Sequence, residues 1–167
     1  MKNEVFKSQV CSVARALELV GEWWTLLIVR EAFFGARRFS EFENNLGIAK
    51  NVLSQRLAKL VKGGVLERTA VVGRGNPQDY TLTERGRDLL PVVVALMQWG
   101  DRWMHGRGRA PVRLFDREGG KEIPPLRVRS ATGKPLSFEE IVVAPGPGAN
   151  EAVRRRFGST PGERNRR

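Results

Sequence analysis

The sequence predicts a mainly α-helical domain with one β-hairpin, followed by a small β-rich appendage and a disordered basic tail. Apolar residues recur at helical spacing up to residue 62, and two β-type runs then flank a Gly/Pro/Asn turn. Farther along, the sequence changes to short apolar runs broken by Gly and Pro, and the last residues have no apolar period. We therefore expect three parts, at residues 1–108, 109–145 and 146–167.

Two helices are expected at the start of the chain. Between Ser8 and about Val20, apolar residues such as Val13 and Leu17 recur at helical spacing, and Gly21 ends the pattern. The following run, residues 23–35, is almost continuously apolar and ends in a glycine, which is typical of a buried helix.

A short helix and a longer one follow, separated by Gly47. Ser40 with Glu43 three residues later has the spacing of a capping box, which predicts the start of the short helix. The longer helix ends at the glycine pair 63–64, and its leucines lie on one side, at Leu53, Leu57 and Leu60.

The opposite side of this longer helix is polar, and residues 45–65 contain no acidic residue. A carboxylate there would meet DNA phosphate, whereas short amides and hydroxyls suit base edges and Lys or Arg suit phosphates. We expect base contacts from Asn51, Ser54 and Gln55, and backbone contacts from Arg37, Arg38, Lys50, Arg56, Lys59 and Arg74. The alternative is a solvated basic face on a purely structural helix.

Residues 65–72 and 78–83 read as the two strands of the hairpin, with Arg74 at its tip. Thr83 then has the position of a cap for a last long helix, residues 84–106, in which Pro91 is expected to produce a kink. This helix is apolar over more than one stripe, so a second copy of the chain is the simplest cover. The expected dimer contacts are Leu96, Trp99 and Trp103.

Composition and charge narrow the function. A net charge of +11 and a pI near 11 favour a polyanionic partner. The sequence has no signal-peptide pattern and no long apolar run, so we expect a cytoplasmic protein that does not enter the membrane. One cysteine and one histidine offer no metal cluster or catalytic pair, so we expect no enzyme, metal or cofactor.

Several of these segments together resemble the HxlR-type regulators, a winged-helix family related to the MarR type. The resemblance rests on "CSVARALELVGEWWTLLIVREAFFGARRFSEFENNLG", "VLSQRLAKLVKGGVLERT", "YTLTERG" and "LMQWGDRW", and it covers about residues 9–105. It implies a homodimeric bacterial transcription regulator whose first and last helices pair the subunits. It also implies a wing formed by residues 66–82.

The chain departs from this family pattern at two positions. Ala49 replaces the usual Ser or Thr at the start of the recognition helix, a loss of capping that costs roughly 0.5 to 2 kcal/mol. Trp23 replaces the usual Lys or Arg. Trp23 and Trp24 could line a cavity for a small-molecule effector, or they could both be core residues.

Two further features carry open alternatives. Cys11 stands where some family members have a redox-active thiol, and Lys7 and Arg15 nearby would favour a thiolate; a buried, inert thiol is the alternative. The appendage resembles a zinc-ribbon-like tail in which Gly119, Arg129 and Thr132 stand where cysteines would sit, so we expect no zinc there.

These features together predict a dimeric transcription regulator, a repressor, acting on a pseudo-palindromic operator in double-stranded DNA. Its half-sites would lie about 34 to 36 Å apart, one helical turn of DNA. The alternative is a winged-helix protein-interaction module without specific DNA binding.

Overall fold

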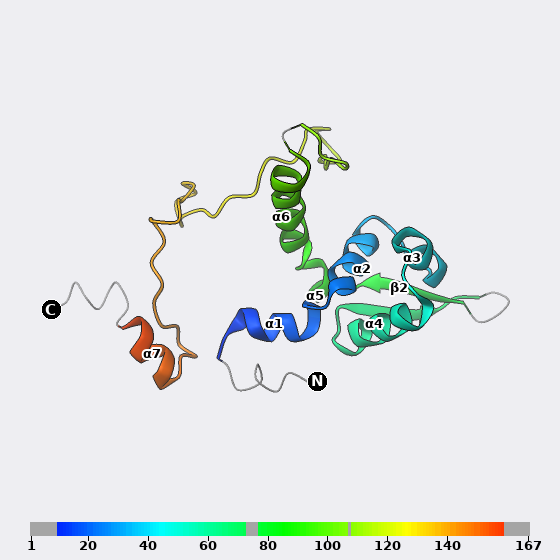
Figure 1. Cartoon of the computed structure of the whole chain (residues 1–167), viewed down its shortest axis with the longest axis horizontal. Coiled ribbons are helices and arrows are strands. Elements are labelled where there is room, and N and C mark those ends of the chain that lie inside the picture. The colour runs from blue at the N-terminus through cyan, green and yellow to red at the C-terminus, as the bar shows by residue number, and fades with distance from the viewer. Residues whose placement is uncertain (1–9, 73–76, 107, 159–167) are drawn as a thin grey trace. The chain divides into compact units, whose positions relative to one another are not determined.

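The computed structural model describes residues 10–72, 77–106 and 108–158. Figure 1 shows its elements by colour along the chain. They are α1 (Ser12–Val20), α2 (Trp23–Phe33), α3 (Phe39–Leu46), α4 (Lys50–Lys62), β1 (Leu66–Ala70), β2 (Gln78–Leu82), α5 (Glu84–Arg87), α6 (Leu90–Gly100), the π-helical turn η2 (Asp101–His105) and α7 (Glu151–Phe157). The chain divides into two compact units, one of residues 16–126 and one of the two ends.

The larger unit is built around α2, which contacts α3, α4, α6 and β2. Ile28 and Val29 of α2 are completely buried, as is Phe42 of α3. The expected leucine stripe of α4 completes this core, because its three leucines are at most 1% exposed. The periodicity of α4 therefore predicted its buried side, and the helix has one face left for solvent.

The α3–α4 pair is a helix-turn-helix with Gly47 at the turn. Gly47 adopts a left-handed φ of 62° and donates its backbone N–H to Glu43 at 2.9 Å, which ends α3. The start of α3 differs from the expectation. Glu41, not Glu43, is the capping carboxylate, and it accepts hydrogen bonds from the backbone N–H groups of Arg37 at 2.7 Å and Arg38 at 2.9 Å. Two exposed N–H groups at the helix start are satisfied by this one side chain.

The predicted hairpin is present, with β1 and β2 antiparallel in a register from Leu66 opposite Leu82 to Ala70 opposite Gln78. Only the first pair is buried, while the rest of β1 is exposed, so the hairpin is anchored at its base. The backbone before α3 joins the outer edge of β2, where Tyr80 donates its N–H to the carbonyl of Arg37 at 2.8 Å. The hairpin and the helix-turn-helix are thus joined by backbone hydrogen bonds.

The expected single helix over residues 84–106 is three pieces. Thr83 does cap the first, since its hydroxyl accepts a hydrogen bond from the N–H of Gly86 at 3.1 Å. The helix is then interrupted before α6, and Pro91 lies in the first turn of α6, where its missing N–H is tolerated. Pro91 therefore begins a helix rather than kinking one, and α6 continues into η2.

The appendage is not β-rich, which corrects the expectation. In its described residues the only β-pairing consists of isolated bridges, between Phe115 and Glu122 and between Arg129 and Pro135. Gly119–Gly120 and Pro124–Pro125 interrupt the sequence between short apolar runs, and proline has no N–H for a ladder. The segment before residue 126 is held instead by Gln98 of α6, whose amide bonds the carbonyl of Pro124 and the N–H of Leu126 at 3.1 and 2.8 Å.

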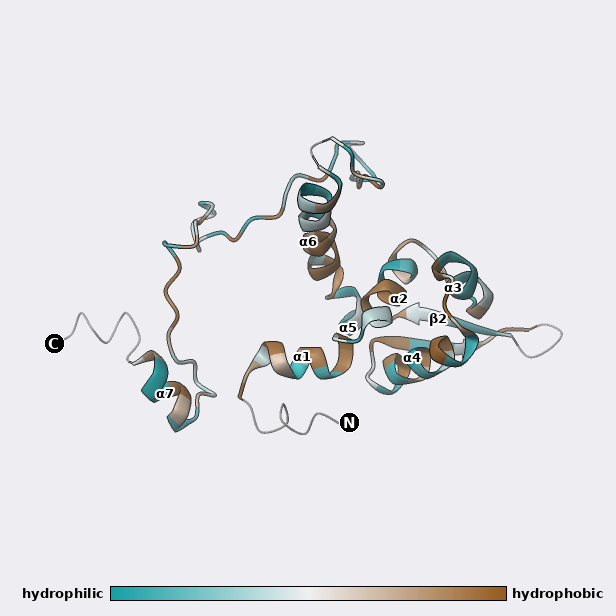
Figure 2. Ribbon diagram, viewed as in Figure 1, coloured by the Kyte–Doolittle hydropathy of each residue, from teal (hydrophilic) through white to brown (hydrophobic). Residues whose placement is uncertain are grey.

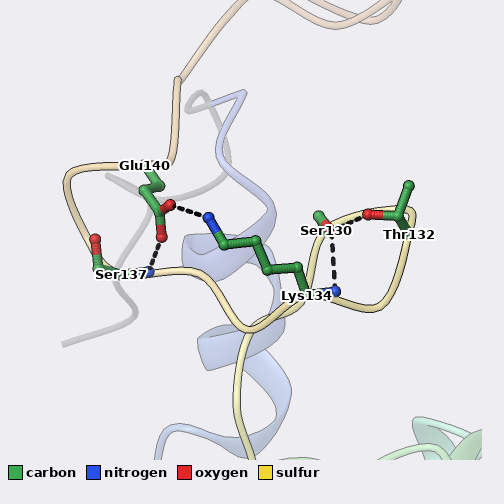
Figure 3. A network of polar contacts seen from close by, with 5 residues as sticks. All are labelled: Ser130, Thr132, Lys134, Ser137 and Glu140. Atoms are coloured by element: carbon green, nitrogen blue, oxygen red, sulfur yellow. Dashed lines mark hydrogen bonds and ion pairs between the residues drawn. The ribbon is translucent and has the colours of Figure 1, made fainter.

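Within the smaller unit, residues 130–140 are linked by local polar contacts (Figure 3). Glu140 accepts a hydrogen bond from the N–H of Ser137 at 2.8 Å and pairs with Lys134 at 2.6 Å. Ser130 accepts from the N–H of Lys134 at 3.1 Å and bonds Thr132 at 2.9 Å. Most of the apolar side chains here, including Phe138, are exposed.

The expectation of a disordered tail is wrong for residues 151–157, which form α7. Asn150 caps the helix by accepting a hydrogen bond from the N–H of Val153 at 3.0 Å, and Gly158 ends it with φ of 67°. Glu151 in the first turn and three arginines in the last turn complement the helix dipole. These local signals are sufficient without an apolar stripe. Residues 159–167 lie outside the described part of the chain.

Candidate nucleic-acid interface

The outer face of α4, defined here by Asn51, Ser54, Gln55, Ala58 and Lys62, is exposed at all five positions. At 100° per residue these side chains lie opposite the leucine stripe that enters the core. No large apolar side chain lies among them, and within residues 10–72, 77–106 and 108–158 their polar atoms are exposed rather than covered by the chain. The structure thus gives the predicted base-contacting residues the required exposure, and their role stays a prediction.

The first turn of α4 lacks a side-chain cap. Ala49 occupies the N-cap position in an extended conformation, φ −63° and ψ 137°, with no side-chain hydrogen bond to the helix. Because alanine has no acceptor, the first N–H groups of α4 remain available to another acceptor. The helix begins at Lys50, whose side chain is 77% exposed and lies 3.8 Å from Glu43, a weak pair at the surface.

Arg37 and Arg38, both expected at the DNA backbone, differ in their surroundings. Arg37 is exposed at the α2–α3 corner. Arg38 forms a 2.6 Å ion pair with Asp79 of β2, and its side chain is 36% exposed. Arg38 therefore links the start of α3 to the hairpin, in addition to any contact outside the chain.

Arg56 and Lys59 lie on the flank of α4 that faces the start of α2. Both pair with Glu22, Arg56 at 2.5 Å and Lys59 at 3.6 Å. The Arg56 side chain is only 22% exposed. Glu22 was not singled out from the sequence, because no helical or strand period connects it with α4. Arg74 lies outside the described residues, while Arg68 of β1 is a further exposed cation of the hairpin.

The capping hydrogen bonds at α3 change the acidity of Glu41. The backbone N–H of Arg38, and then that of Arg37, hold the pKa of the Glu41 carboxyl below its usual value of 4.5. Hydrogen bonds to the ionised form stabilise it. Glu41 is therefore a carboxylate at neutral pH and is engaged by the backbone rather than directed at a partner.

The outer face of α6, defined here by Val92, Leu96, Trp99 and Trp103, is apolar and exposed. The exposed fractions of Leu96, Trp99 and Trp103 are 53, 54 and 61%. Their spacing follows successive helical turns into η2, and Figure 2 shows the first part of α6 in brown, the hydrophobic colour. Exposed apolar side chains in a row are what a protein–protein contact would need, and their role in dimerisation stays a prediction.

Trp23 and Trp24 do not share an environment. Trp23 is 92% exposed, so the alternative of two core tryptophans fails, while Trp24 packs against the core. A hollow of about 480 Å³ lies elsewhere, between the end of α2 and the α6–η2 junction. Phe34, Leu96 and Met97 supply apolar walls, and Arg30 with Asp101 supplies charge. Neither tryptophan lines it.

Cys11 lies immediately before α1, and its carbonyl accepts the backbone N–H of Arg15 at 3.0 Å. Its side chain is exposed, so the alternative of a buried thiol fails. Lys7, expected to act on this thiol, lies outside the described residues.

The described residues contain no group of three or more His, Cys, Asp or Glu side chains arranged to hold a metal ion. In the same part of the chain, no helix has the length and apolar character needed to cross a membrane.

Comparison with known proteins supports the helix-turn-helix assignment. An HTH-type transcriptional regulator of Mycobacterium tuberculosis is 44% identical over 137 residues, which covers 82% of this chain and 87% of that protein. The crystal structure of PA1607, a candidate transcription factor, matches with a TM-score of 0.77 at 42% identity, covering 84% of this chain and 98% of that one. The redox regulator HypR in its reduced form matches with a TM-score of 0.51 at 28% identity, over 55% and 91% of the two chains.

The HxlR-like helix-turn-helix family matches residues 19–107, more than half of the chain. That stretch contains α2, the α3–α4 pair, the hairpin and the helices up to η2. The chain belongs to the HxlR-like helix-turn-helix family of transcriptional regulators.

Proposed function

We propose that this regulator is a homodimeric, sequence-specific repressor that binds a pseudo-palindromic operator in the bacterial cytoplasm. The observation that carries the proposal is the outer face of α4, which is exposed, polar and free of acidic residues. A helix of this kind enters the major groove and reads base edges with its N-terminal half. Asn51, Ser54 and Gln55 are the base-reading residues.

The phosphate contacts fall to the exposed cations that flank this face. Lys50 at the start of α4 and Arg37 before α3 are the principal ones. Arg74, which lies outside the described residues and is expected in the turn of the hairpin from the sequence alone, is a third. The uncapped N–H groups that follow Ala49 add hydrogen-bond donors suited to a phosphate oxygen. Arg38, Arg56 and Lys59 are held by carboxylates of their own chain, so their main contribution is to hold the interface in shape.

Dimerisation through the outer face of α6 supplies the second recognition helix. Leu96, Trp99 and Trp103 are each more than half exposed, and a twofold interface that pairs the same face with itself would bury them. Two α4 helices would then contact half-sites about 34 to 36 Å apart. Occupancy of such an operator blocks transcription by exclusion.

Salt titration of DNA binding separates this proposal from a protein-interaction module. A duplex selected by the protein from a random pool is the probe, with an unrelated duplex for comparison. Six or so phosphate contacts predict a loss of affinity of roughly 10³-fold between 50 and 200 mM salt. Selection that enriches no sequence, or binding insensitive to salt, would leave the interaction module as the better assignment.

Oxidation of Cys11 is the proposed regulatory input. Its side chain is exposed immediately before α1, and the similar HypR structures include a reduced and an oxidised form of a redox regulator. An exposed thiol can form a mixed or intersubunit disulfide, which would change the spacing of the recognition helices. Diamide should weaken operator binding by the wild type and not by Cys11→Ser. Equal sensitivity of the two proteins would remove Cys11 from the mechanism.

A small-molecule effector is proposed to act at the hollow beside α6 rather than at the tryptophan pair. Leu96 lines the hollow and also belongs to the outer face of α6, so an occupant there would alter the dimer contact. This location would be supported if a ligand still changes the operator affinity of Trp23→Ala but no longer changes that of Phe34→Ala. The reverse pattern would return the site to Trp23.

A further inference from the structure

We infer that Glu22, which lies outside the recognition helix, sets the orientation of that helix and neutralises one of its cations, so that it restrains nonspecific binding to DNA. The inference rests on the proposed DNA-binding function and assigns a positioning role within the same interface. It starts from the contacts of one carboxylate at the beginning of α2.

Glu22 occupies the N-cap position of α2 but does not cap it. Its backbone carbonyl accepts the N–H of Thr25 at 2.9 Å, while its side chain makes no hydrogen bond to the helix. The carboxylate reaches across to α4 instead, where Oε2 pairs with Arg56 at 2.5 Å and Oε1 with Lys59 at 3.6 Å. Glu22, the residue before α2, thus pairs with two cations that lie about one turn apart on the same flank of α4.

The Glu22–Arg56 and Glu22–Lys59 ion pairs have different roles, because Arg56 and Lys59 differ in burial and in the direction in which they leave α4. At 100° per residue, Arg56 lies about 140° from Asn51, beside the core stripe, and its side chain is 22% exposed. Its Nε is buried and has no hydrogen-bond partner among the described residues. A half-buried guanidinium depends on its carboxylate, so this pair fixes the rotation of α4 against α2.

Lys59 lies nearer to the outer face of α4, about 80° from Asn51, and is 35% exposed. A flexible lysine at that edge is within reach of a phosphate when the helix lies in a groove. Glu22 competes with the phosphate for this ammonium group. Lys50 on the same helix is the natural comparison, because its ion pair with Glu43 is longer at 3.8 Å and its side chain is 77% exposed.

The local backbone keeps Glu22 close to α4. Gly21 joins α1 to α2, and a Cβ at this position would lie 2.5 Å from the carbonyl oxygen of Leu17. A glycine is therefore required for the tight corner that brings the start of α2 against the flank of α4. The contact is a consequence of the chain path, and sequence spacing alone does not reveal it.

The first test compares two lysines of α4 in otherwise intact protein. Binding to an unrelated duplex is measured from 50 to 200 mM salt for wild type, Lys50→Gln and Lys59→Gln. The slope of log K against log salt should become shallower by about 1.8 for Lys50→Gln, the loss of one phosphate contact in each subunit of the dimer, and should not change for Lys59→Gln. Equal shallowing by both variants would overturn the inference, since Lys59 would then contact phosphate in spite of Glu22.

The second test removes the carboxylate. Glu22→Gln should steepen the slope by about 1.8, as Lys59 is released in each subunit of the dimer, and Glu22→Gln with Lys59→Gln should restore the wild-type slope. The ratio of affinities for the selected and unrelated duplexes should fall about fivefold in Glu22→Gln, the low end of the effect of one lost base contact. Glu84→Gln on α5, exposed and with the same change in net charge, should alter neither quantity.

The outcomes distinguish failure of the proposed DNA-binding function from failure of the inference about Glu22 alone. A wild type that binds no duplex in a salt-dependent manner would overturn the proposed function and this inference with it. The inference alone would be overturned if the wild type selects a sequence but Glu22→Gln changes neither the salt slope nor the ratio of affinities for the selected and unrelated duplexes. If Glu22→Gln proves unfolded by circular dichroism, the comparison of Lys50→Gln with Lys59→Gln decides.

Discussion

The outer faces of α4 and α6 are both exposed in the single chain, yet their side chains differ in kind. The α4 face carries amides, a hydroxyl and a lysine at Asn51, Ser54, Gln55 and Lys62. The α6 face carries valine, leucine and two tryptophans, with Trp99 and Trp103 more than half exposed. Figure 2 shows the contrast, since α4 alternates between teal and brown whereas the first part of α6 is brown.

This difference indicates two different partners. Polar groups that are already hydrated lose little by staying in water and gain by meeting base edges with matching donors and acceptors. Exposed apolar area costs about 25 cal/mol per Å² relative to burial, so the α6 face gains most from an apolar partner such as its own copy. The proposed operator complex and the proposed dimer would therefore use different surfaces of the chain.

Charge placed on the α6 face should have the largest effect. Trp99→Glu should weaken the dimer by at least 2 kcal/mol, about 30-fold. The tryptophan that the dimer contact would bury is lost, and a carboxylate would have to be desolvated in its place. Sedimentation velocity across a concentration series measures this. Ser40→Glu, an exposed substitution on α3, is the control and should leave the dimer intact. A Trp99→Glu protein that still sediments as a dimer would place the interface elsewhere.

On the α4 face, removal of an amide that would contact base edges should change the selectivity for DNA sequence. Gln55→Ala should cost about 1 to 3 kcal/mol on the selected duplex and much less on unrelated sequences, because a base contact is specific and a phosphate contact is not. Competition binding with single base-pair variants of the selected duplex measures the change. Uniform weakening on every sequence would assign Gln55 to the backbone instead.

A capping substitution at the start of α4 should have a smaller effect, on the free energy of unfolding. Ala49→Ser should stabilise the protein by about 1 kcal/mol, since a hydroxyl can accept an N–H of the first turn that alanine leaves without a side-chain partner. Urea unfolding of wild type and variant gives the difference. Loss of stability would mean that the extended Ala49 conformation does not suit a capping hydroxyl.

The smallest expected effect concerns pH at the neighbouring helix α3. The folded-state pKa of Glu41 is lowered by the N–H groups of Arg38 and Arg37, so its stabilising contribution is present above its ordinary pKa of 4.5. That contribution is lost as pH falls below 4.5 through the lowered folded value. Unfolding experiments from pH 7 to 3 should give a shallower pH dependence for Glu41→Gln than for wild type. Identical pH profiles would exclude this role.

The elements with a regular apolar period were predictable from the sequence. The leucine stripe of α4 located both its core and its outer face, and the β-type runs around the turn located the hairpin. Where order comes from local polar contacts, an apolar period does not predict it. Glu41 replaces the expected cap of α3, Pro91 starts a helix, and Asn150 with Gly158 bounds α7 without any apolar stripe.

The candidate site divides in the same way. Exposure of Asn51, Ser54 and Gln55 follows from helical geometry, so the sequence was sufficient to predict it. The pairing of Arg38 with Asp79, and of Arg56 and Lys59 with Glu22, depends on how separate elements meet in space. A count of positive charges along α4 therefore overstates how many of them face a partner.

Hydroxyl-radical footprinting on the selected duplex tests the central claim, that two α4 outer faces enter one duplex through a dimer built on α6. We expect two protected regions whose centres lie about 10 to 10.5 base pairs apart, and both should be lost with Trp99→Glu at concentrations where the wild type is bound. A single protected region, or a footprint unchanged by Trp99→Glu, would contradict it.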